Sequence, residues 1–420
     1  MKRLVFLFIL FVAFSCGSTK KISNQNLSYL YAPGINFIYP DYKAYNFQKD
    51  TSRIFYSLPA EDLLFMNQND SMGFMASYGF TYVIYSNYES KQILDSGQIN
   101  FELMKPTVSS GAATGYFDVH TRDSSNYLAL ITLTDFNRNQ AVTSFLTIDR
   151  TGSQSPDNFI ALDKTSNLPL TSSTGKPGTR LRLIGGKQSD RSIYIRYFKN
   201  KYGLSAPPFG NELARPLSYI ADKTILANAG DMDNIILDEP GIYHFQYDTM
   251  MKEGYTIMCF DEDYPKITTA EDLLESIRYL TTRQEYDKIR NSKDTKQAVD
   301  DFWIQMAGNK ERARVLIRNY YSRVQLANRF FTSYLEGWKS DRGLIYIIFG
   351  PPGTIYRTND SENWNYTQNY YYGTLNFTFD KLNNPFTDND YKLRRSNYYE
   401  MPWYRAVDSW RDGRVVNDME

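Results

Sequence analysis

The first part of the chain, from about residue 28 to residue 150, alternates short apolar runs with polar turn residues. Its clearest runs, at residues 80–85, 127–133 and 144–148, mix aromatic and β-branched side chains, which favour strands. Asp, Asn, Ser and Gly residues, which are typical of turns, lie between the runs. Several short strands at this spacing predict an antiparallel β-sandwich-like module over residues 28–150.

A second series of strand patterns extends over residues 179–264. Its clearest segments are 192–198, 234–237 and 241–247, and in the first of them large side chains occupy both faces. This pattern indicates a sheet that is covered on both sides. Residues 151–178, between the two patterned regions, are rich in Ser, Thr, Gly and Pro, so we predict a linker there.

The spacing of apolar positions then changes from two residues to three or four, which indicates helices. A capping-box pattern at Thr268–Asp272 opens this region. We expect its long last helix to end at Gly337 in the left-handed conformation. Residues 344–349 are continuously apolar, which predicts a strand buried on both faces. The expected fold class is α+β and multidomain, with two N-terminal antiparallel β-sandwich-like modules followed by a C-terminal mixed α/β domain over residues 265–420.

The start of the chain has the features of a secretory signal peptide. Lys2 and Arg3 are basic, and the 11 residues from 4 to 14 are apolar. A helix of that length rises about 16 Å, which is too short for a hydrocarbon core of about 30 Å. We therefore predict a signal peptide over residues 1–15 rather than a membrane-spanning helix. The sequence up to Cys16 resembles a bacterial lipobox, and this resemblance implies cleavage before Cys16 and lipidation of its thiol.

The residues after Cys16 bear on the location of the protein. Lys20 and Lys21 make this segment basic, whereas surface lipoproteins of Bacteroidetes-type bacteria often carry an acidic export tag there. By this resemblance we expect an outer-membrane lipoprotein that faces the periplasm. Residues 16–27 are interpreted as a tether, and an acylated cysteine would hold the protein at the membrane.

Composition and charge argue against several classes of protein. The 47 basic residues equal the 47 acidic residues in number, whereas a nucleic-acid-binding protein normally has a basic excess. The chain has only two His and two Cys, so we expect neither a metal site nor a cofactor nor a His-based catalytic triad. Cys259 lies in an apolar run and is interpreted as a buried thiol. Aromatic residues make up 16%, mostly Tyr and Phe, which suits partly hydrated strands and interfaces.

The most specific motif begins at Gly337. The order Gly-Trp-Lys-Ser-Asp resembles the glycine-tryptophan-any-threonine-aspartate signature of the GWxTD domain family, with serine in place of threonine. The pairs Phe302–Trp303 and Ala327–Asn328 also match the family. The motif residues are Gly337, Trp338, Ser340, Asp341, Arg342, Gly343, Gly350, Pro351 and Pro352. The resemblance covers residues 265–410 and implies a domain of Bacteroidetes-type envelope proteins without an established catalytic activity.

The signature positions have structural interpretations of their own. Trp338 could pack between the long helix and the strand predicted after it. Ser340 or Asp341 could accept backbone N–H groups in a turn. Arg342 could pair with Asp341 or with an acidic group elsewhere. We prefer this structural interpretation, and a ligand-binding or catalytic role for Asp341 and Arg342 is the alternative.

Aromatic residues are dense again after Pro352. The candidate interface residues are Trp364, Tyr366, Tyr370, Tyr371, Tyr372, Trp403 and Tyr404. Such side chains can stack on sugar rings, contact a protein partner or pack inside the domain. The acidic cluster at residues 261–263 is interpreted as a solvated linker, although two suitably placed carboxylates could also hydrolyse a glycan.

The sequence thus predicts a non-enzymatic outer-membrane lipoprotein, anchored through Cys16. It would serve as an accessory or scaffold subunit of an envelope complex that assembles, secretes or supports outer-membrane proteins. The first alternative is a glycan-binding lipoprotein that uses aromatic surfaces. The second alternative is a carboxylate-dependent hydrolase of cell-wall glycan. No nucleic-acid partner is expected.

Overall fold

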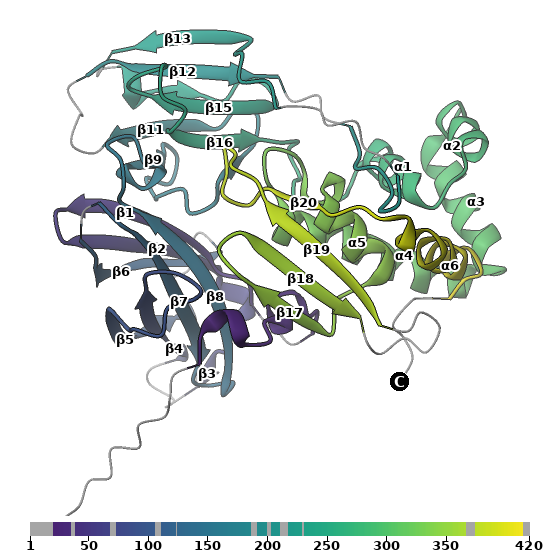
Figure 1. Cartoon of the computed structure of the whole chain (residues 1–420), viewed down its shortest axis with the longest axis horizontal. Coiled ribbons are helices and arrows are strands. Elements are labelled where there is room, and N and C mark those ends of the chain that lie inside the picture. Colours follow the sequence, from purple (N-terminus) through teal and green to yellow (C-terminus); the bar gives the residue numbers. More distant parts are fainter. Residues whose placement is uncertain are drawn as a thin grey trace, which may run out of the picture.

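The computed structural model describes residues 20–34, 38–67, 73–105, 111–122, 124–185, 191–199, 203–210, 217–228, 231–366 and 374–414. Two β-sandwiches come first along the chain, and a domain of helices with one further sheet follows. Figure 1 shows the sandwiches on one side of the molecule and the helices α1, α2 and α3 on the other. This architecture confirms the predicted α+β class with β modules before a mixed C-terminal domain.

Two antiparallel sheets form the N-terminal sandwich. One sheet has the order β1 (Asp41–Gln48), β2 (Thr51–Pro59) and β6 (Ala112–His120). The other contains β3 (Met66–Asn67), β4 (Phe74–Tyr85), β5 (Asp95–Met104), β7 (Asn126–Asp135) and β8 (Gln140–Asp149), and β4 pairs with β5 on one side and β7 on the other. Every second residue of β2 is buried, because side chains of a strand alternate between its faces. The buried residues of both sheets share one apolar core.

The second sandwich follows the same principle. One sheet has the order β14 (Ile235–Ile236), β11 (Arg180–Gly185) and β9 (Phe159–Asp163). The other has the order β10 (Thr174–Gly175), β16 (Tyr255–Cys259), β15 (Gly241–Gln246), β12 (Ile193–Phe198) and β13 (Lys223–Ala227). Cys259 lies at the end of β16 and is buried in the shared core, so the predicted buried thiol is confirmed.

The structure corrects the predicted linker at residues 151–178. Strands β9 and β10 lie inside this range, and Phe159 and Ala161 are fully buried in the core of the second sandwich. The apolar run that forms β9 is short and is surrounded by Ser, Asn and Pro. Because a strand of five residues shows barely two repeats of a period of two, its signal was hidden by the polar flanks.

The C-terminal domain packs helices against a four-stranded antiparallel sheet. The helices are α1 (Ala270–Ser276), α2 (Arg283–Arg290), α3 (Thr295–Ala307), α4 (Lys310–Phe331), α5 (Asp341–Phe349) and α6 (Glu400–Arg411), with a 3₁₀ turn η8 (Gly337–Lys339) before α5. The sheet has the order β17 (Thr354–Arg357), β18 (Ser361–Tyr366), β19 (Leu375–Lys381) and β20 (Tyr391–Leu393).

The first helix of this domain, α1, begins where the local sequence pattern predicted. The side chain of Thr269 accepts a hydrogen bond from the backbone N–H of Asp272 at 3.1 Å, and the Asp272 carboxylate accepts one from the N–H of Thr269 at 3.3 Å. This is the predicted capping box, and it satisfies two backbone donors at the start of α1. Helix α3 ends at Gly308, whose φ of 79° is a conformation that glycine adopts without strain.

Two other predictions for this region are wrong. Helix α4 ends at Phe331, and Gly337 begins the 3₁₀ turn η8 instead of terminating the helix. The apolar run at residues 344–349 forms most of helix α5 instead of a strand. All nine residues of α5 are buried. A helix that is enclosed on every side has no polar face, so its sequence shows no helical period and resembles a buried strand.

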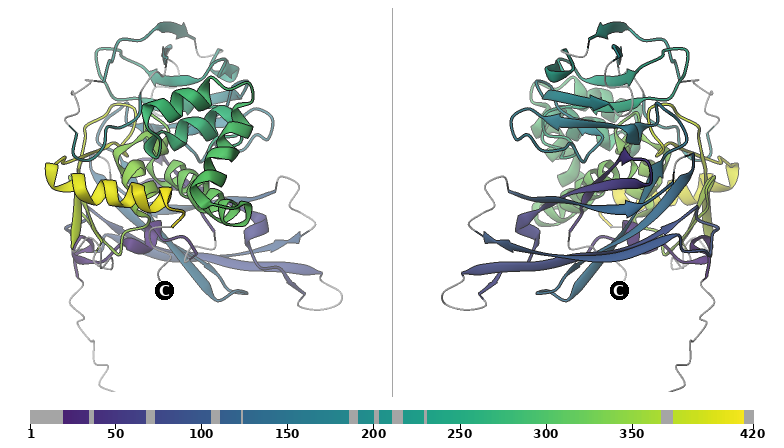
Figure 2. Two further views of the ribbon diagram at one scale, coloured as in Figure 1. Left: turned by 90° about the vertical axis from the view of Figure 1, so that its right-hand side faces the viewer. Right: turned by 90° about the vertical axis from the view of Figure 1, so that its left-hand side faces the viewer.

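The predicted tether is corrected as well. Cys16 lies outside the described residues, but the segment over residues 22–31 packs against the C-terminal domain (Figure 2). Ile22 and Leu27 are buried in the core of that domain. The backbone N–H of Leu27 donates to the carbonyl of Ile355 in β17 at 2.9 Å. This segment therefore covers the free edge of β17, which would otherwise expose unpaired backbone groups.

Contacts between the three modules join them closely. Arg329 of α4 forms an ion pair with Asp41 of β1 at 2.8 Å. Phe386 of the C-terminal domain packs edge-to-face against Phe198 of β12, with the ring centres 4.8 Å apart. Among the described helices, none combines the length and the apolar character that are needed to cross a membrane.

Candidate functional site

The signature segment lies where α4, η8 and α5 come into close contact. A Cβ atom added to Gly337 would lie 2.0 Å from the carbonyl oxygen of Ala327 in α4. A Cβ atom added to Gly343 would lie 2.0 Å from the carbonyl oxygen of Gly337. Both positions therefore need glycine because three stretches of backbone meet there without room for a side chain.

The tryptophan of the signature is enclosed between helices. Trp338 is 4% exposed, and its backbone N–H donates to the side-chain oxygen of Asn328 at 3.1 Å. The nitrogen of the same Asn328 side chain donates to the carbonyl of Pro265 at 3.1 Å. Asn328 thus ties α4 to η8 and to the chain that enters the helical region.

The serine of the signature is the N-cap of α5. Its Oγ accepts a hydrogen bond from the N–H of Gly343 at 3.0 Å and donates to the carbonyl of Gly337 at 2.6 Å. A hydroxyl is needed for both bonds, so threonine could replace Ser340 without loss of this cap. This is the turn role that the sequence predicted for Ser340.

Asp341 interacts with β20 and with the segment that follows it. Its carboxylate forms an ion pair with Arg395 at 2.6 Å and accepts the backbone N–H of Leu393 at 2.7 Å. It therefore does not pair with its neighbour Arg342, which was one of the two predicted possibilities. Its interactions fix β20 and the segment after it to the start of α5.

Arg342 belongs to a buried ion network centred on Glu362. The Oε2 atom of Glu362 accepts hydrogen bonds from Arg342 and from Arg357, each at 3.1 Å. The Oε1 atom accepts the indole N–H of Trp364 at 2.8 Å. Glu362 is fully buried and Arg342 is 2% exposed. Arg342 therefore pairs with an acidic group elsewhere in the sequence, the second of the predicted possibilities.

The network contains two guanidinium groups for one carboxylate. Arg342 lies over the ring of Tyr391 at 4.0 Å and donates to the carbonyl of Asn389 at 2.9 Å. Arg357 donates to the hydroxyl of Tyr31, which comes from the N-terminal segment. Aromatic faces attract cations, so some of the many tyrosines of the chain help to stabilise these two guanidinium groups.

The electrostatics of Glu362 limit its chemistry. Burial alone raises the pKa of a carboxyl group, but Arg357 and Arg342 hold the pKa of Glu362 below its usual value. The group therefore stays ionised near neutral pH and can accept but not donate a proton. Because Glu362 is fully buried and its two oxygens are already hydrogen-bonded, the arrangement favours a structural role for this network.

Three of the seven candidate interface residues are wrong. Trp364, Tyr366 and Trp403 are buried in the core of the C-terminal domain, where the inward face of β18 packs on the helices. Tyr404, on α6, is 48% exposed and remains available for contacts. The other predicted interface residues, Tyr370, Tyr371 and Tyr372, lie outside the described residues.

Several partners of Asp341 and several residues of the network around Glu362 were missed from the sequence. These are Tyr31, Arg357, Glu362, Asn389 and Arg395. One signal was present, because Glu362 has the same spacing along β18 as Trp364 and Tyr366, two residues apart. A carboxylate in line with two core aromatic residues indicates a buried, paired charge. Arg357 lies only five residues before Glu362, but Arg342 and Tyr31 come from more distant segments, and no local signal paired them.

The two histidines and the second cysteine do not form a site. His120 is exposed on β6, whereas His244 is fully buried on β15 in the other sandwich. Burial raises the pKa of the Cys259 thiol to about 12. Asp261, Glu262 and Asp263 are exposed after β16, as the predicted solvated linker requires. Among the described residues, no group of three His, Cys, Asp or Glu side chains is placed to hold a metal ion.

The buried His244 predicts a specific pH dependence of stability. Burial lowers its pKa to about 4, and its ring nitrogens contact the hydroxyl of Thr256 at 2.8 Å and the carbonyl of Lys252 at 3.0 Å. The unfolded chain binds a proton at this residue below about pH 6.5. The contribution of His244 to the free energy of unfolding is therefore fully present above pH 6.5. It decreases by on the order of 3 kcal/mol in all as the pH falls toward 4.

Urea unfolding of the wild type and of His244→Gln at several pH values measures this effect. The difference between the two free energies of unfolding should change over this pH interval. The exposed His120 provides the control, because His120→Gln should follow the wild type. A pH-independent difference between wild type and His244→Gln would contradict the prediction.

Comparisons with known proteins identify part of the chain. Residues 241–412 match the family model described as GWxTD domain. No curated protein matches the chain with significance. Among solved structures, the chain is similar to a transglutaminase from red sea bream, with 7% identity, a TM-score of 0.19, and coverage of 54% of this chain and 32% of that chain.

A second solved structure is a C-terminal 282-residue fragment of intimin in complex with the intimin-binding domain of its translocated receptor. The identity is 11%, the TM-score is 0.15, and the alignment covers 86% of this chain and 94% of that chain. At such TM-scores neither structure supports a conclusion about fold or function, and the chain spans about a third of the transglutaminase.

Proposed function

We propose that this protein, whose residues 241–412 contain a GWxTD domain, is a lipid-anchored accessory subunit of a protein complex in the bacterial outer membrane. In this proposal it faces the periplasm and has no catalytic activity of its own. Its role is to present a rigid surface to the other subunits.

The observation that carries the proposal is the use of the signature residues inside the domain. Trp338, Asp341 and Arg342 are all buried, and their polar groups bond to other elements of the same chain. A catalytic or ligand-binding signature would have to present at least some of these groups to a substrate. The signature instead builds the framework, as expected for a scaffold.

The N-terminal segment supports the proposed anchor. Because Ile22 and Leu27 are buried in the C-terminal domain, the chain is fixed to that domain soon after the predicted lipid site. Cys16 precedes Lys20 by four residues, which span at most about 14 Å when fully extended. Lipidation at Cys16 would therefore hold the C-terminal domain close to the membrane instead of on a long tether.

Strand β13 offers a surface for a protein partner. It is the last strand in the order of its sheet and, among the described residues, pairs on one side only, with β12. Ile225 is 45% exposed and Leu226 is 54% exposed. An unpaired strand edge with exposed aliphatic side chains is suited to the addition of a strand from another protein.

Affinity purification of the tagged, lipidated protein from detergent-solubilised membranes tests the proposal. We expect a stoichiometric partner with the wild type and a loss of roughly tenfold or more with Leu226→Lys, because the lysine places a charge in an apolar contact. Val315, on α4, is 43% exposed, so Val315→Lys is a matched control that should retain the partner. Recovery of the wild-type protein alone would contradict the proposed function.

A further inference from the structure

The outer face of the sheet that contains β4, β5, β7 and β8 is divided into two halves. At one end, Leu128, Phe145 and Tyr85 pack against the core of the C-terminal domain. At the other end, the side chains of β5 that point outward are exposed, including Gln98, Asn100 and Glu102. One half of this face therefore contacts the C-terminal domain, and the other half is exposed to solvent.

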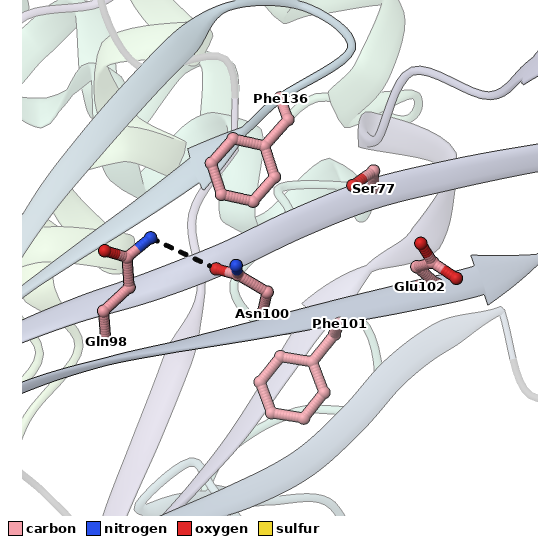
Figure 3. A pocket seen from close by; sticks show the side chains of 6 residues that line it. All are labelled: Ser77, Gln98, Asn100, Phe101, Glu102 and Phe136. Atoms are coloured by element: carbon pink, nitrogen blue, oxygen red, sulfur yellow. Dashed lines mark hydrogen bonds between the residues drawn. The ribbon is translucent and has the colours of Figure 1, made fainter.

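The open half contains a hollow of about 600 Å³ (Figure 3). Its lining residues are Ser77, Gln98, Asn100, Phe101, Glu102 and Phe136. Gly79 lies beneath it, and a Cβ atom there would come within 2.5 Å of the Asn100 side chain and 3.0 Å of the Phe136 ring. The absence of a side chain at Gly79 thus brings the amide and the aromatic ring close together over the sheet.

The polar groups of the hollow are held in place. The side-chain nitrogen of Gln98 donates to the side-chain oxygen of Asn100 at 3.3 Å, as Figure 3 shows. A carboxamide has two N–H donors and an oxygen acceptor, so each of these side chains keeps further hydrogen-bonding capacity after this bond. The hydroxyl of Ser77 and the carboxylate of Glu102 add a donor and acceptors on the same face.

The aromatic ring is also fixed. The backbone N–H of Phe136 donates to the carbonyl of Ser77 at 2.9 Å. The next side chain, Asn137, donates to the carbonyls of Leu64 and Met75 at 2.8 and 2.9 Å. Phe136 itself is 42% exposed. Its ring is therefore an apolar surface that is held by its backbone and open to a ligand.

A ladder of hydroxyl groups extends this surface across the sheet. Thr81 pairs in register with Gln98 on β5 and with Thr132 on β7. The hydroxyls of Thr132 and Thr143 are 2.9 Å apart on β7 and β8. The polar surface therefore extends beyond the hollow onto β7 and β8. A surface of this length suits a ligand made of several linked units better than a single small molecule.

We propose that this open face binds a neutral oligosaccharide. The amides, hydroxyls and single carboxylate match the many hydroxyl groups of a sugar, and Phe136 provides a face for its apolar C–H groups. None of the six lining residues is a cation, which argues against a phosphate or sulfate ligand. One carboxylate, Glu102, is too few for the two-acid mechanism of most glycosidases, so binding and not hydrolysis is inferred.

This inference does not depend on the proposed scaffold function. Binding of neutral hexasaccharides of glucose, mannose, galactose and N-acetylglucosamine to the full chain, measured by calorimetry, tests it. At least one hexasaccharide should bind, and Phe136→Ala and Asn100→Ala should each weaken that affinity about tenfold, as expected for the loss of one stacking ring or one hydrogen-bonding group. Added salt should leave the affinity unchanged because the ligand is neutral.

Tyr116, on β6 of the opposite sheet, is 49% exposed and supplies the control. The Tyr116→Ala variant should bind like the wild type. All three substituted residues are exposed, and thermal unfolding checks that each variant is folded. The inference is overturned if none of the hexasaccharides binds, if Phe136→Ala and Asn100→Ala bind as well as the wild type, or if Tyr116→Ala loses affinity equally.

Discussion

Replacing Glu362 with glutamine is expected to destabilise the C-terminal domain by about 3–5 kcal/mol, the range typical of a buried charge that loses its partner. Glutamine has nearly the same shape as glutamate but no charge. Arg342 and Arg357, which share the Glu362 carboxylate at 3.1 Å, would then be left as buried cations without the carboxylate that pairs with both of them. Urea unfolding followed by tryptophan fluorescence measures the change, since Trp364 donates to Glu362 directly.

An exposed ion pair in the same sheet provides the control. Asp380 of β19 pairs with Arg394 at 2.7 Å, and both side chains are largely accessible to solvent. Surface pairs of this kind contribute roughly 0–1 kcal/mol, so Asp380→Asn should have a small effect. Equally small effects of Glu362→Gln and Asp380→Asn would show that the network around Glu362 contributes no more to stability than a surface ion pair does.

The N-terminal segment is expected to have a comparable effect. A chain that begins at Ile38 lacks Ile22, Leu27 and Tyr31, all of which are buried in the C-terminal domain. Burial of one large apolar side chain contributes about 1.5–3 kcal/mol, so we expect a loss of roughly 5 kcal/mol or more. The removal also exposes the edge of β17 and deprives Arg357 of its bond with Tyr31.

Comparing the unfolding of this shortened chain with that of a chain that begins at Lys20 tests the expectation. Leu27→Ala in the longer chain should account for about 2–5 kcal/mol by itself. Gln25 lies in the same segment but is exposed, so Gln25→Ala should be close to neutral. Equal stability of the two chains would mean that residues 20–34 do not complete the domain.

The N-terminal segment extends the C-terminal domain beyond the residues that match the family. The family match begins at residue 241, yet the core that contains Trp338 and Trp364 also contains Ile22 and Leu27 from the start of the chain. In this protein the GWxTD domain therefore includes residues from both ends of the chain. The same segment leads back toward Cys16, so the proposed lipidation there would link the anchor directly to this domain.

The extent to which the sequence predicted the fold depended on the range of each interaction. The capping box at Thr269 and the strand that carries His244 were predicted correctly, because their signals lie within a few residues. Helix α5 was predicted as a strand, since its complete burial removed the polar face that marks a helix. Strand β9 was missed because it is short and has polar neighbours.

In the candidate site too, short-range interactions were predicted from the sequence and long-range ones were not. Ser340 has the turn role that its neighbours in the sequence suggested, because its bonds reach only to Gly337 and Gly343. The partners of Arg342 lie 20 and 47 residues further along the chain, at Glu362 and Asn389. No local pattern could have paired them.

By itself, the sequence determined the class of the fold, the order of the β modules and the C-terminal domain, the identity of that domain and the balance of charge. Each of these is a property of composition or of short segments. Only the tertiary structure decided that the signature is buried, that Trp364, Tyr366 and Trp403 are core residues, and that the tether completes the last domain. The physical reason is that burial depends on which distant segments pack together. The free energy of that packing depends on all of these segments at once, so no single residue or short pattern reveals it.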